Sequence, residues 1–329
     1  MSAFDSRLSL SFDLYYRKTT DLLMNVDIPT ITGFSNAMQN IGKMRNKGLE
    51  ITLTGIPFKT KQFSWEASGN ISINRNKVLA LGPTGDPIFS DGGAGTTHIT
   101  MIGKPIGSFY GYKMIGIFKT KEELNQYPHF ADTQAGDVKF EDVNKDGKIN
   151  ADDRTIIGSN MPDYTWGMTH SFAFKGFDAS LSVLGVVGSD VLHLGRRFYT
   201  QGEGNQNQLS EMMNRWQSET NPGNGWIPRA NSQPTGQNNV ISSRWIENGS
   251  FLRVSNLTIG YTMPLGFVKK CGMQRARIYA SVQNLLTISS YTGYNPETSF
   301  KEDNVTAAGT DYGMYPLYRT CTLGVNVTF

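Results

Sequence analysis

Cysteine and histidine are scarce in this chain, with two cysteines and four histidines in 329 residues. Cys271 and Cys321 are too few for a disulfide framework or a cysteine-ligated zinc site. They leave either one disulfide or two unpaired thiols, and we favour the second. The four histidines are scattered, at His98, His129, His170 and His193, and none has metal-ligand spacing. A zinc enzyme or a Ser–His–Asp hydrolase therefore has little support, and no serine stands in a recognisable nucleophile motif.

Charge and long apolar runs are also in short supply. Charged residues make up 18% of the chain, and 31 Lys and Arg against 28 Asp and Glu give a net charge of +3. That balance argues against a nucleic-acid partner. No stretch of about 20 apolar residues is present to form a transmembrane helix. The first residues lack the basic start and apolar core of a signal peptide. The mean hydropathy of −0.35 resembles that of a soluble protein, but β-barrel membrane strands are apolar on only one face and escape this test.

The chain is rich in glycine and in segments whose apolar and polar residues alternate. Glycine accounts for 35 residues and aromatic side chains for 11%, which favours β-structure with long loops over a helical bundle. Apolar and polar residues alternate in eight segments of the sequence. These are 7–16, 49–54, 63–74, 164–174, 177–187, 257–263, 276–282 and 321–329. Many exceed the usual 5 to 6 residues of a globular strand and approach the roughly 9 to 11 that cross a bilayer with tilt.

The connections between these segments alternate between short and long. Residues 55–62, 175–176 and 264–274 are short, whereas 18–45, 76–163, 188–250 and 287–315 are long. Outer-membrane barrels have short periplasmic turns and long external loops. We therefore predict an all-β fold, about eight strands of a large antiparallel transmembrane β-barrel with long extracellular loops. The segment Ser108–Phe118 also reads as a strand, but a full span there would break the alternation, so we place it at the barrel rim.

Several motifs follow one another along nearly the whole chain. They are YYRKTTDLL at 15–23, GFSNAMQNIGKMRNKG at 33–48, FSWEASGNISINRNKVLAL at 63–81, GDVKFEDVNKDGKINADDRTIIG at 136–158, MPDYTWG at 161–167, GSFLRVSNLTIGY at 249–261, ARIYASVQNLL at 276–286 and the closing LGVNVTF. In these motifs the sequence resembles SusC/RagA-type TonB-linked (TonB-dependent) outer-membrane transporters. The resemblance implies a barrel of about 22 strands closed by a plug, of which residues 1–329 would be the C-terminal part without plug or N-terminal strands. We expect this part, with two open sheet edges, not to form the barrel alone.

The resemblance also implies function and partners. It implies energised import of a bulky nutrient, an oligosaccharide or glycan or a peptide, across the outer membrane of a Gram-negative, Bacteroidetes-like bacterium, with no enzymatic chemistry. The implied partners are a SusD-like lipoprotein, outer-membrane lipids and the TonB–ExbB–ExbD motor, the last through a region that this chain lacks. The terminal Phe329 resembles the signal that the barrel-assembly machinery reads. The nutrient itself is unknown.

One local motif predicts a metal site. Residues 142–153 match the D-x-[DN]-x-[DN]-G pattern of an EF-hand loop. The candidate ligands are Asp142, Asn144, Asp146, the Lys148 carbonyl, Asn150 and Asp153. Asp153 stands where Glu is usual, which weakens bidentate Ca²⁺ binding and leaves Mg²⁺ as an alternative. Val138 and Phe140 read as extended, so this is a single loop without flanking helices. A metal-free Asp/Asn/Gly turn is the competing interpretation, and we favour the metal.

Other features are better explained by structure than by chemistry. The spacing of Leu209, Met212, Met213 and Trp216 predicts a helix that packs its loop. Loop aromatics could stack on sugars, but we expect packing or belt roles for most of them, namely Tyr199, Trp226, Trp245, Tyr291 and Tyr294. The competing functions are a calcium-stabilised secreted β-protein that binds glycans and, ranked last, an outer-membrane enzyme.

Overall fold

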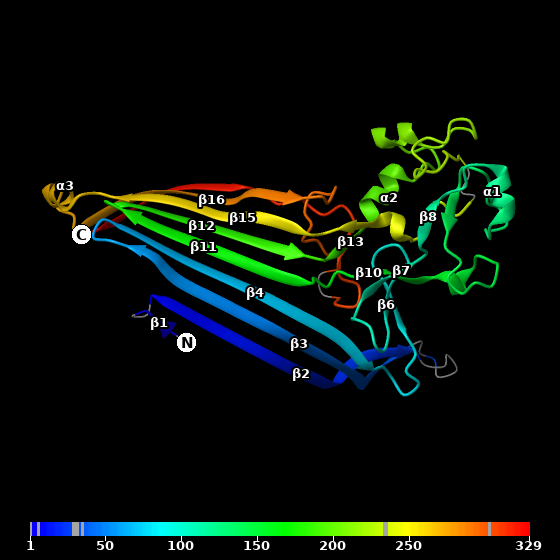
Figure 1. Ribbon diagram of the computed structural model, residues 1–329, viewed down its shortest axis with the longest axis horizontal. Helices are drawn as coiled ribbons and strands as arrows, with labels where there is room; N and C mark the ends of the chain where they lie inside the picture. Colours follow the sequence, from blue (N-terminus) through cyan, green and yellow to red (C-terminus); the bar gives the residue numbers. More distant parts are fainter. Residues whose placement is uncertain (1, 5–6, 28–32, 34–35, 233–235, 302–303) are drawn as a thin grey trace.

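Antiparallel strands dominate the computed structural model, which describes residues 2–4, 7–27, 33, 36–232, 236–301 and 304–329 (Figure 1). Nine strands form one antiparallel sheet in the order β1-β2-β3-β4-β11-β12-β15-β16-β18. Their bounds are β1 Ser2–Ala3, β2 Leu8–Asp27, β3 Asn36–Lys59, β4 Phe63–Ala80, β11 Tyr164–Phe174, β12 Phe177–Val187, β15 Phe251–Thr262, β16 Arg275–Ser289 and β18 Thr320–Thr328. All but the two-residue β1 match, in order, the eight segments whose alternation predicts strands.

The two faces of this sheet differ in chemistry because the register aligns the alternation of every strand. Ile51 pairs with Phe12 on one side and Ile71 on the other. Further along, Leu257 lies between Leu181 and Val282. The opposite face carries hydroxyl pairs that hydrogen-bond across strands, namely Thr54–Ser68 at 2.9 Å, Thr169–Ser182 at 3.1 Å and Thr258–Ser281 at 2.9 Å. One face thus suits lipid and the other a wet lumen.

Several strand glycines lie beneath an aromatic ring from the neighbouring strand. Tyr15 pairs with Gly48, and Tyr279 pairs with Gly324. A Cβ atom added to Gly324 would lie 2.3 Å from Cζ of Tyr279, and one added to Gly48 would lie 2.4 Å from Cζ of Tyr15. No side chain larger than hydrogen fits under these rings. Part of the high glycine content is therefore a packing requirement of the sheet.

Short and long connections lie at opposite ends of the sheet (Figure 1). At one end, tight turns join β3 to β4 and β11 to β12, and the β15–β16 connection carries the short helix α3, Leu265–Lys270. At the other end the long connections gather. This arrangement confirms the loop distribution predicted from the sequence. The structure has no helix in its described ranges that is long and apolar enough to cross a membrane.

The prediction that residues 18–45 form a loop is largely wrong. β2 runs on to Asp27 and β3 starts at Asn36, and the two strands pair up to Asp27 and Asn36. Polar residues such as Lys18 and Thr19 interrupt the apolar alternation there. A hairpin that extends past the two-faced part of the sheet has water on both faces, so pairing persists where the periodic signal has ended.

The long connections fold into a loop layer, which we define as residues 81–163, 188–250 and 290–319. It holds a sheet of β5 Ile88–Asp91, β6 Thr96–Thr100, β7 Ser108–Gly111 and β10 Thr155–Gly158, a sheet of β13 Asp190–His193, β14 Ile246–Asn248 and β17 Thr310–Asp311, and the pair β8 Met114–Ile117 and β9 Val138–Phe140. Its helices are α1 Lys121–Gln126 and α2 Leu194–Thr200, with 3₁₀ turns η2 Ala151–Asp153, η3 Ser210–Asn214 and η4 Ser243–Trp245.

This layer settles two further predictions. The segment Ser108–Phe118 splits into β7 and β8, which lie outside the nine-stranded sheet, as the rim placement requires. The helix predicted around Leu209 and Trp216 is instead the five-residue 3₁₀ turn η3. Leu209 and Met213 are exposed while Met212 is buried, so the segment lacks the continuous buried stripe that would sustain an α-helix.

Two hydrophobic core clusters lie in the loop layer. One cluster comprises Phe109, Leu192, Leu194, Ile241 and Trp245. A second comprises Met114, Ile117, Val138, Phe140 and Ile149. Apolar side chains of the long strands, by contrast, are exposed, including Phe12, Leu14, Ile259 and Leu323. The sheet is thus a wall, and the packed part of the chain sits at one end of it.

Candidate functional site

The loop 142–153 follows β9 and ends in η2, within the loop layer. Its side-chain oxygens are held by backbone N–H groups of the same loop. Asp142 Oδ2 accepts from Gly147 at 2.9 Å, and Asn144 Oδ1 accepts from Asp146 at 3.0 Å. The backbone N–H of Lys148 donates to Asp146 Oδ1 at 2.9 Å. Lys145 and Gly147 have positive φ angles of 61° and 79°, so the loop turns sharply where the motif requires it.

Asp153 has a role that the sequence pattern did not reveal. Its side chain is fully buried, and its two oxygens accept the backbone N–H groups of Val143 and Asn150 at 2.9 and 2.8 Å. Asn150 in turn caps η2, with its side-chain oxygen accepting from Asp152 at 2.7 Å. A capping box of this kind is recognisable from an Asn followed three residues later by an acidic side chain. Ile149 is buried in the second core cluster and anchors the loop.

The predicted ligands are therefore close in sequence but are not all gathered around one point. Within the described ranges, no group of three or more His, Cys, Asp and Glu side chains is placed to hold a metal ion. The exposed side chains of Asn144 and Asp146 bond each other at 3.1 Å. Asp142 Oδ1 is buried and has no hydrogen-bond partner. The environment of that oxygen suits a cation, because an unpaired buried carboxylate oxygen is costly.

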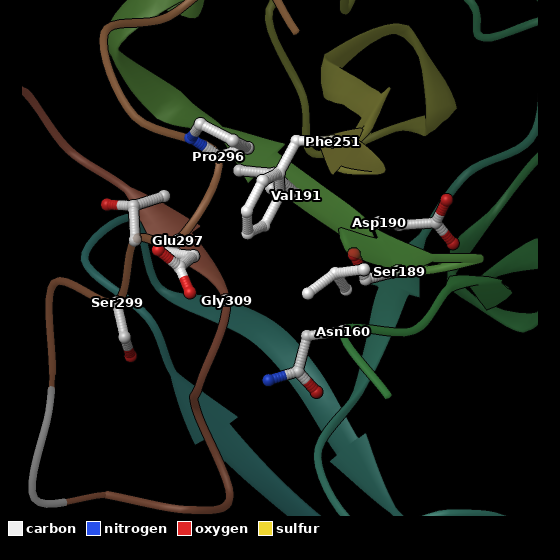
Figure 2. Close-up of a pocket in the computed structure, with 11 residues that line it drawn as sticks. Asn160, Ser189, Asp190, Val191, Phe251, Pro296, Glu297, Ser299 and Gly309 are labelled. Atoms are coloured by element: carbon white, nitrogen blue, oxygen red, sulfur yellow. The ribbon is translucent and has the colours of Figure 1, made fainter. Parts of the chain in front are cut away.

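A pocket of about 360 Å³ lies where the loop layer meets the polar face of the sheet. Figure 2 shows Val191, Phe251 and Pro296 on one side of it, facing Asn160 across the cavity. Its other lining residues are Val186, Ser189, Asp190, Glu297, Thr298, Ser299 and Gly309. The hydroxyls of Thr298 and Ser299 are buried without a hydrogen-bond partner. Apolar walls with unpaired hydroxyls make this a candidate contact site for a polar ligand.

The charges around this pocket are fixed by the strands beneath it. Arg253 of β15 lies on the polar face and forms an ion pair with Glu297. Arg253 also donates to Asn295 Oδ1 at 3.1 Å and to Thr287 Oγ1 at 3.0 Å. Burial raises the pKa of Asp190, whose Oδ2 accepts the backbone N–H of Ser159 at 3.0 Å. Through its contacts with Asn295 and Glu297, Arg253 ties the loop 290–319 to the wall.

A second charged cluster joins the segments 188–250 and 290–319 of the loop layer. Glu247 of β14 accepts from His193 at 3.0 Å, from Arg196 at 3.0 Å and from the hydroxyl of Thr292 at 2.8 Å. Burial alone would raise the pKa of Glu247, but these hydrogen bonds outweigh it and hold that pKa at about 2. Arg196 also binds Glu211 at 2.7 Å. We call His193, Arg196, Glu211, Glu247 and Thr292 the loop clasp.

His98 is a further buried group, on β6. Its Nδ1 lies 2.7 Å from Thr97 Oγ1 and its Nε2 lies 3.1 Å from the carbonyl oxygen of Ala308. Thr97 Oγ1 accepts the backbone N–H of Gly92, so its own proton is directed at Nδ1. The neutral tautomer with hydrogen on Nε2 therefore satisfies every atom. Burial lowers the pKa of His98 to about 4.

The loop aromatics divide into two groups. Trp245 and Tyr291 are buried, and the Tyr291 hydroxyl donates to Asp311 Oδ2 at 2.5 Å, as expected for loop packing. Tyr199, Trp226 and Tyr294 are exposed. Phe329 is 80% exposed and follows β18, where Val325 and Val327 continue the lipid-facing row. Cys271 and Cys321 are both free, which confirms the unpaired alternative.

Comparison with known proteins shows relatives for the whole length of this chain. Residues 3–285 match the family model described as TonB dependent receptor-like, beta-barrel. The chain is 38% identical over 343 residues to TonB-dependent receptor P3 of Formosa agariphila, covering all of this chain and 33% of the relative. It is 30% identical over 336 residues to TonB-dependent receptor SusC of Bacteroides thetaiotaomicron, covering 99% of this chain and 30% of SusC.

Solved structures agree with the sequence relatives. The RagAB peptide importer in its open-open state superposes with a TM-score of 0.80 at 27% identity, over all of this chain and 33% of that one. This chain thus spans about a third of the length of the relatives it matches. The two-faced sheet, the loops gathered at one end and these matches lead to one assignment: the chain belongs to the TonB-dependent receptor β-barrel family, of the SusC/RagA type, and is part of such a barrel.

Proposed function

We propose that this chain is part of the wall and mouth of an outer-membrane importer for a bulky nutrient, an oligosaccharide or a peptide. The observation that carries the proposal is the sheet itself, with one continuous apolar face, one hydroxyl-lined face and its long loops at one end. A wall of this kind separates lipid from a wet passage. The mixed apolar and hydroxyl lining of the pocket near Phe251 supports contact with a polar ligand rather than a lipid.

We further propose partners for this importer. A SusD-like lipoprotein would cover the loop layer, and the TonB–ExbB–ExbD system would supply energy through residues outside this chain. The similarity to SusC and to the RagAB importer supports both partners. We propose that the apolar face of the wall contacts outer-membrane lipids. We also propose that the barrel-assembly machinery recognises Phe329. This role is transport without bond-breaking chemistry.

A growth assay tests the import proposal. Cells lacking the receptor gene would be complemented with wild-type receptor or with Asn160→Ala/Ser299→Ala, and grown on single oligosaccharides or peptides as the sole nutrient. We expect growth on one nutrient class, dependence on TonB, and weaker growth of the pocket variant at low nutrient concentration. The matched control is Asn224→Ala/Ser218→Ala, in the loop layer away from the pocket. Equal growth with and without the receptor on every nutrient would overturn the proposal.

We also propose that the 142–153 loop holds Ca²⁺, or Mg²⁺ in its place. The support is the motif spacing together with the buried, unpartnered Oδ1 of Asp142. Asp142, Asn144 and Asp146 would supply side-chain oxygens, and Lys148 its carbonyl. Asn150 and Asp153 would serve mainly as the structural caps described above. The bound ion would neutralise clustered carboxylates and stiffen the outer loop.

Calcium titration tests this site. Protection of the loop amides from hydrogen exchange should rise with micromolar to millimolar Ca²⁺ in the wild-type receptor, the range of extracellular calcium modules being about 10⁻⁴–10⁻³ M. Asp142→Asn/Asp146→Asn should abolish that rise. Asp86→Asn/Asp152→Asn removes the same number of charges and should leave it unchanged. A wild-type loop whose protection does not change with either ion would sink the metal interpretation.

A further inference from the structure

The apolar face of the wall carries a band of positive charge at its loop end. Every second residue of β3 lies on this face, and the row reads Leu53, Ile51, Leu49, Lys47, Arg45 and Lys43. The side chains change from apolar to cationic within one step of this row, between Leu49 and Lys47. Positive charge therefore begins where the apolar surface of the strand ends.

The strands on either side of β3 repeat this change in register. Lys18 of β2 and Lys77 of β4 both pair with Arg45, and Arg75 of β4 pairs with Lys47. Residues that pair across adjacent strands point to the same face, about 5 Å apart, and the rows of one face repeat at about 7 Å. Cations from three strands can therefore converge on a single anionic group. We call Lys18, Lys43, Arg45, Lys47 and Lys77 the cation patch.

No carboxylate in the rows of the cation patch balances its charge. The rows to which it belongs in β2, β3 and β4 contain no Asp or Glu, and Asp21 lies in the bulge of β2 beyond them. In the described part of the chain, no side chain of the patch forms an ion pair. Arg75 borders the patch but is bound by Asp163 Oδ1 at 3.0 Å, so we leave it out. The Nε of Arg45 is buried and has no hydrogen-bond partner among the described residues.

The opposite face of the sheet has a different composition at the same level. It carries Arg17, Asn46 and Asn76, which are neighbours in the register. The Nδ2 of Asn76 donates to Asn46 Oδ1 at 3.0 Å, so these two amides bond each other across the strands. The four lysines of the cation patch are exposed. Positive charge is thus concentrated, and open to a partner, on the side that continues the apolar face.

Tyr16 stands between the apolar rows and the cation patch. It pairs with Lys47, and its ring centre lies 5.9 Å from Cζ of Arg45. Its side chain is exposed, and so are those of Leu14 and Phe12 in the rows below it. An aromatic ring with cations just beyond it is typical of the boundary between acyl chains and headgroups. Because the long loops of outer-membrane barrels face the outside, this boundary belongs to the outer leaflet.

We propose that the cation patch binds the phosphate group of a phosphorylated lipid of the outer leaflet, whose acyl chains lie against Leu14 and Phe12. The occupant is a lipid because the cations continue, on the same three strands, the rows that face lipid. A free anion would need only the cations and not the apolar surface directly below them. The inference rests on the outer-membrane placement proposed above and is independent of which nutrient is imported.

Native mass spectrometry of the whole receptor, delipidated in mild detergent, tests the cation patch. Lipid A carrying its phosphates, the same lipid without phosphates, and inorganic phosphate would be titrated against the wild type and Lys18→Gln/Lys47→Gln/Lys77→Gln. We expect the wild type to prefer the phosphorylated lipid. The glutamine variant should bind that lipid about a hundredfold more weakly, since each cation at an anionic membrane surface contributes a factor of about five.

Two further variants serve as controls. Lys61→Gln/Lys269→Gln/Lys270→Gln removes the same charge at the turn end of the sheet, and it should bind the phosphorylated lipid as the wild type does. Lys18→Arg/Lys47→Arg/Lys77→Arg keeps the charge of the patch and should retain the affinity. Folded mobility in gel electrophoresis would establish that each variant is a folded barrel, so that weaker binding reports the lost charge.

Several results would overturn the proposal. Two of them are unchanged affinity of the glutamine variant for the phosphorylated lipid and equal affinity of the wild type for the two lipids. A third is displacement of the lipid by inorganic phosphate, which would make the patch a site for free anions. The last is photo-crosslinking from position 47 in outer-membrane vesicles that captures a protein and no lipid. Membrane fractionation of the same cells distinguishes these results from a receptor that is absent from the outer membrane, which would instead contradict the proposed function.

Discussion

Asp153 closes the 142–153 loop by accepting the backbone N–H of Val143 at 2.9 Å, and its second oxygen holds the N–H of Asn150. This fully buried carboxylate keeps the loop in shape whatever fills its centre.

Removal of that carboxylate should open the loop. Asp153→Ala leaves two partly buried backbone donors without their carboxylate partner, and we expect a local loss of about 2 kcal/mol. Hydrogen exchange at Val143 and Asn150 should accelerate accordingly in the calcium-free receptor. Asp152→Ala, at the exposed neighbour, is the control and should leave both amides protected. Unchanged exchange in the Asp153 variant would show that other contacts hold the loop.

The loop clasp should weaken in acid because of Glu247. Its pKa is about 2 in the folded state against 4.5 for the ordinary side chain, so its contribution is complete above pH 4.5 and disappears as the pH falls toward 2. The shift corresponds to stabilisation on the order of 3 kcal/mol. Proteolysis of the loop layer with an acid-active protease should speed up across this window. Glu247→Gln should be cut faster at neutral pH and lose the dependence below pH 4.5, whereas Glu122→Gln should behave as the wild type.

His98 sets a second and separate pH window. Its pKa is lowered from 6.5 to about 4 by burial, so the unfolded chain takes up a proton between these values while the folded one does not. Stability is therefore complete above pH 6.5 and falls by about 3 kcal/mol as the pH drops to 4. His98→Gln keeps hydrogen-bonding capacity without titrating and should flatten the profile of β6 amide exchange. His129→Gln serves as the comparison, and a profile that stays steep in His98→Gln would contradict the assignment.

The covered glycines of the wall should not tolerate a methyl group. In Gly324→Ala the new Cβ would lie 2.3 Å from Tyr279, and displacement of that ring should cost about 1–3 kcal/mol. The whole receptor should then lose its folded mobility in gel electrophoresis at a lower temperature. Gly69→Ala is the matched control, since its nearest neighbours would be 3.7 Å away. Restoration by the double change Gly324→Ala/Tyr279→Ala would attribute the loss to this contact, and equal melting of both single variants would refute it.

The strands of the wall could be predicted from the sequence because their apolar and polar side chains alternate regularly. Each strand repeats the same two environments every second residue, as at Leu49, Ile51 and Leu53, and pairing then aligns the rows. The tight turn at Lys175–Gly176 and the rim position of Ser108–Phe118 follow from the same alternation. The hairpin beyond Lys18 was missed because water on both faces removes the pattern while the backbone pairing continues.

The loop layer was much less predictable because its contacts join residues that are distant in sequence. His98 binds the carbonyl of Ala308, and Arg229 binds Asp137 at 2.7 Å. Such pairs leave no local spacing, so neither the loop clasp nor the pocket was predicted. The 142–153 motif correctly predicted a sharply turned loop rich in acidic residues. It could not reveal that Asp153 is committed to backbone donors, because a ligand and a cap share the same residue type.

The first hydrophobic cluster and the strand pairing of the loop layer join connections that arise from different hairpins. Phe109 comes from the first, Leu192 and Trp245 from the second, and β17 of the third pairs with β13. A change of length in any one of them must be accommodated by the others. Exchanging a single connection between relatives would therefore disturb its neighbours. An exchange of all three would keep the contacts among them and would have to preserve only those with the wall, such as the ion pair of Arg253 and Glu297.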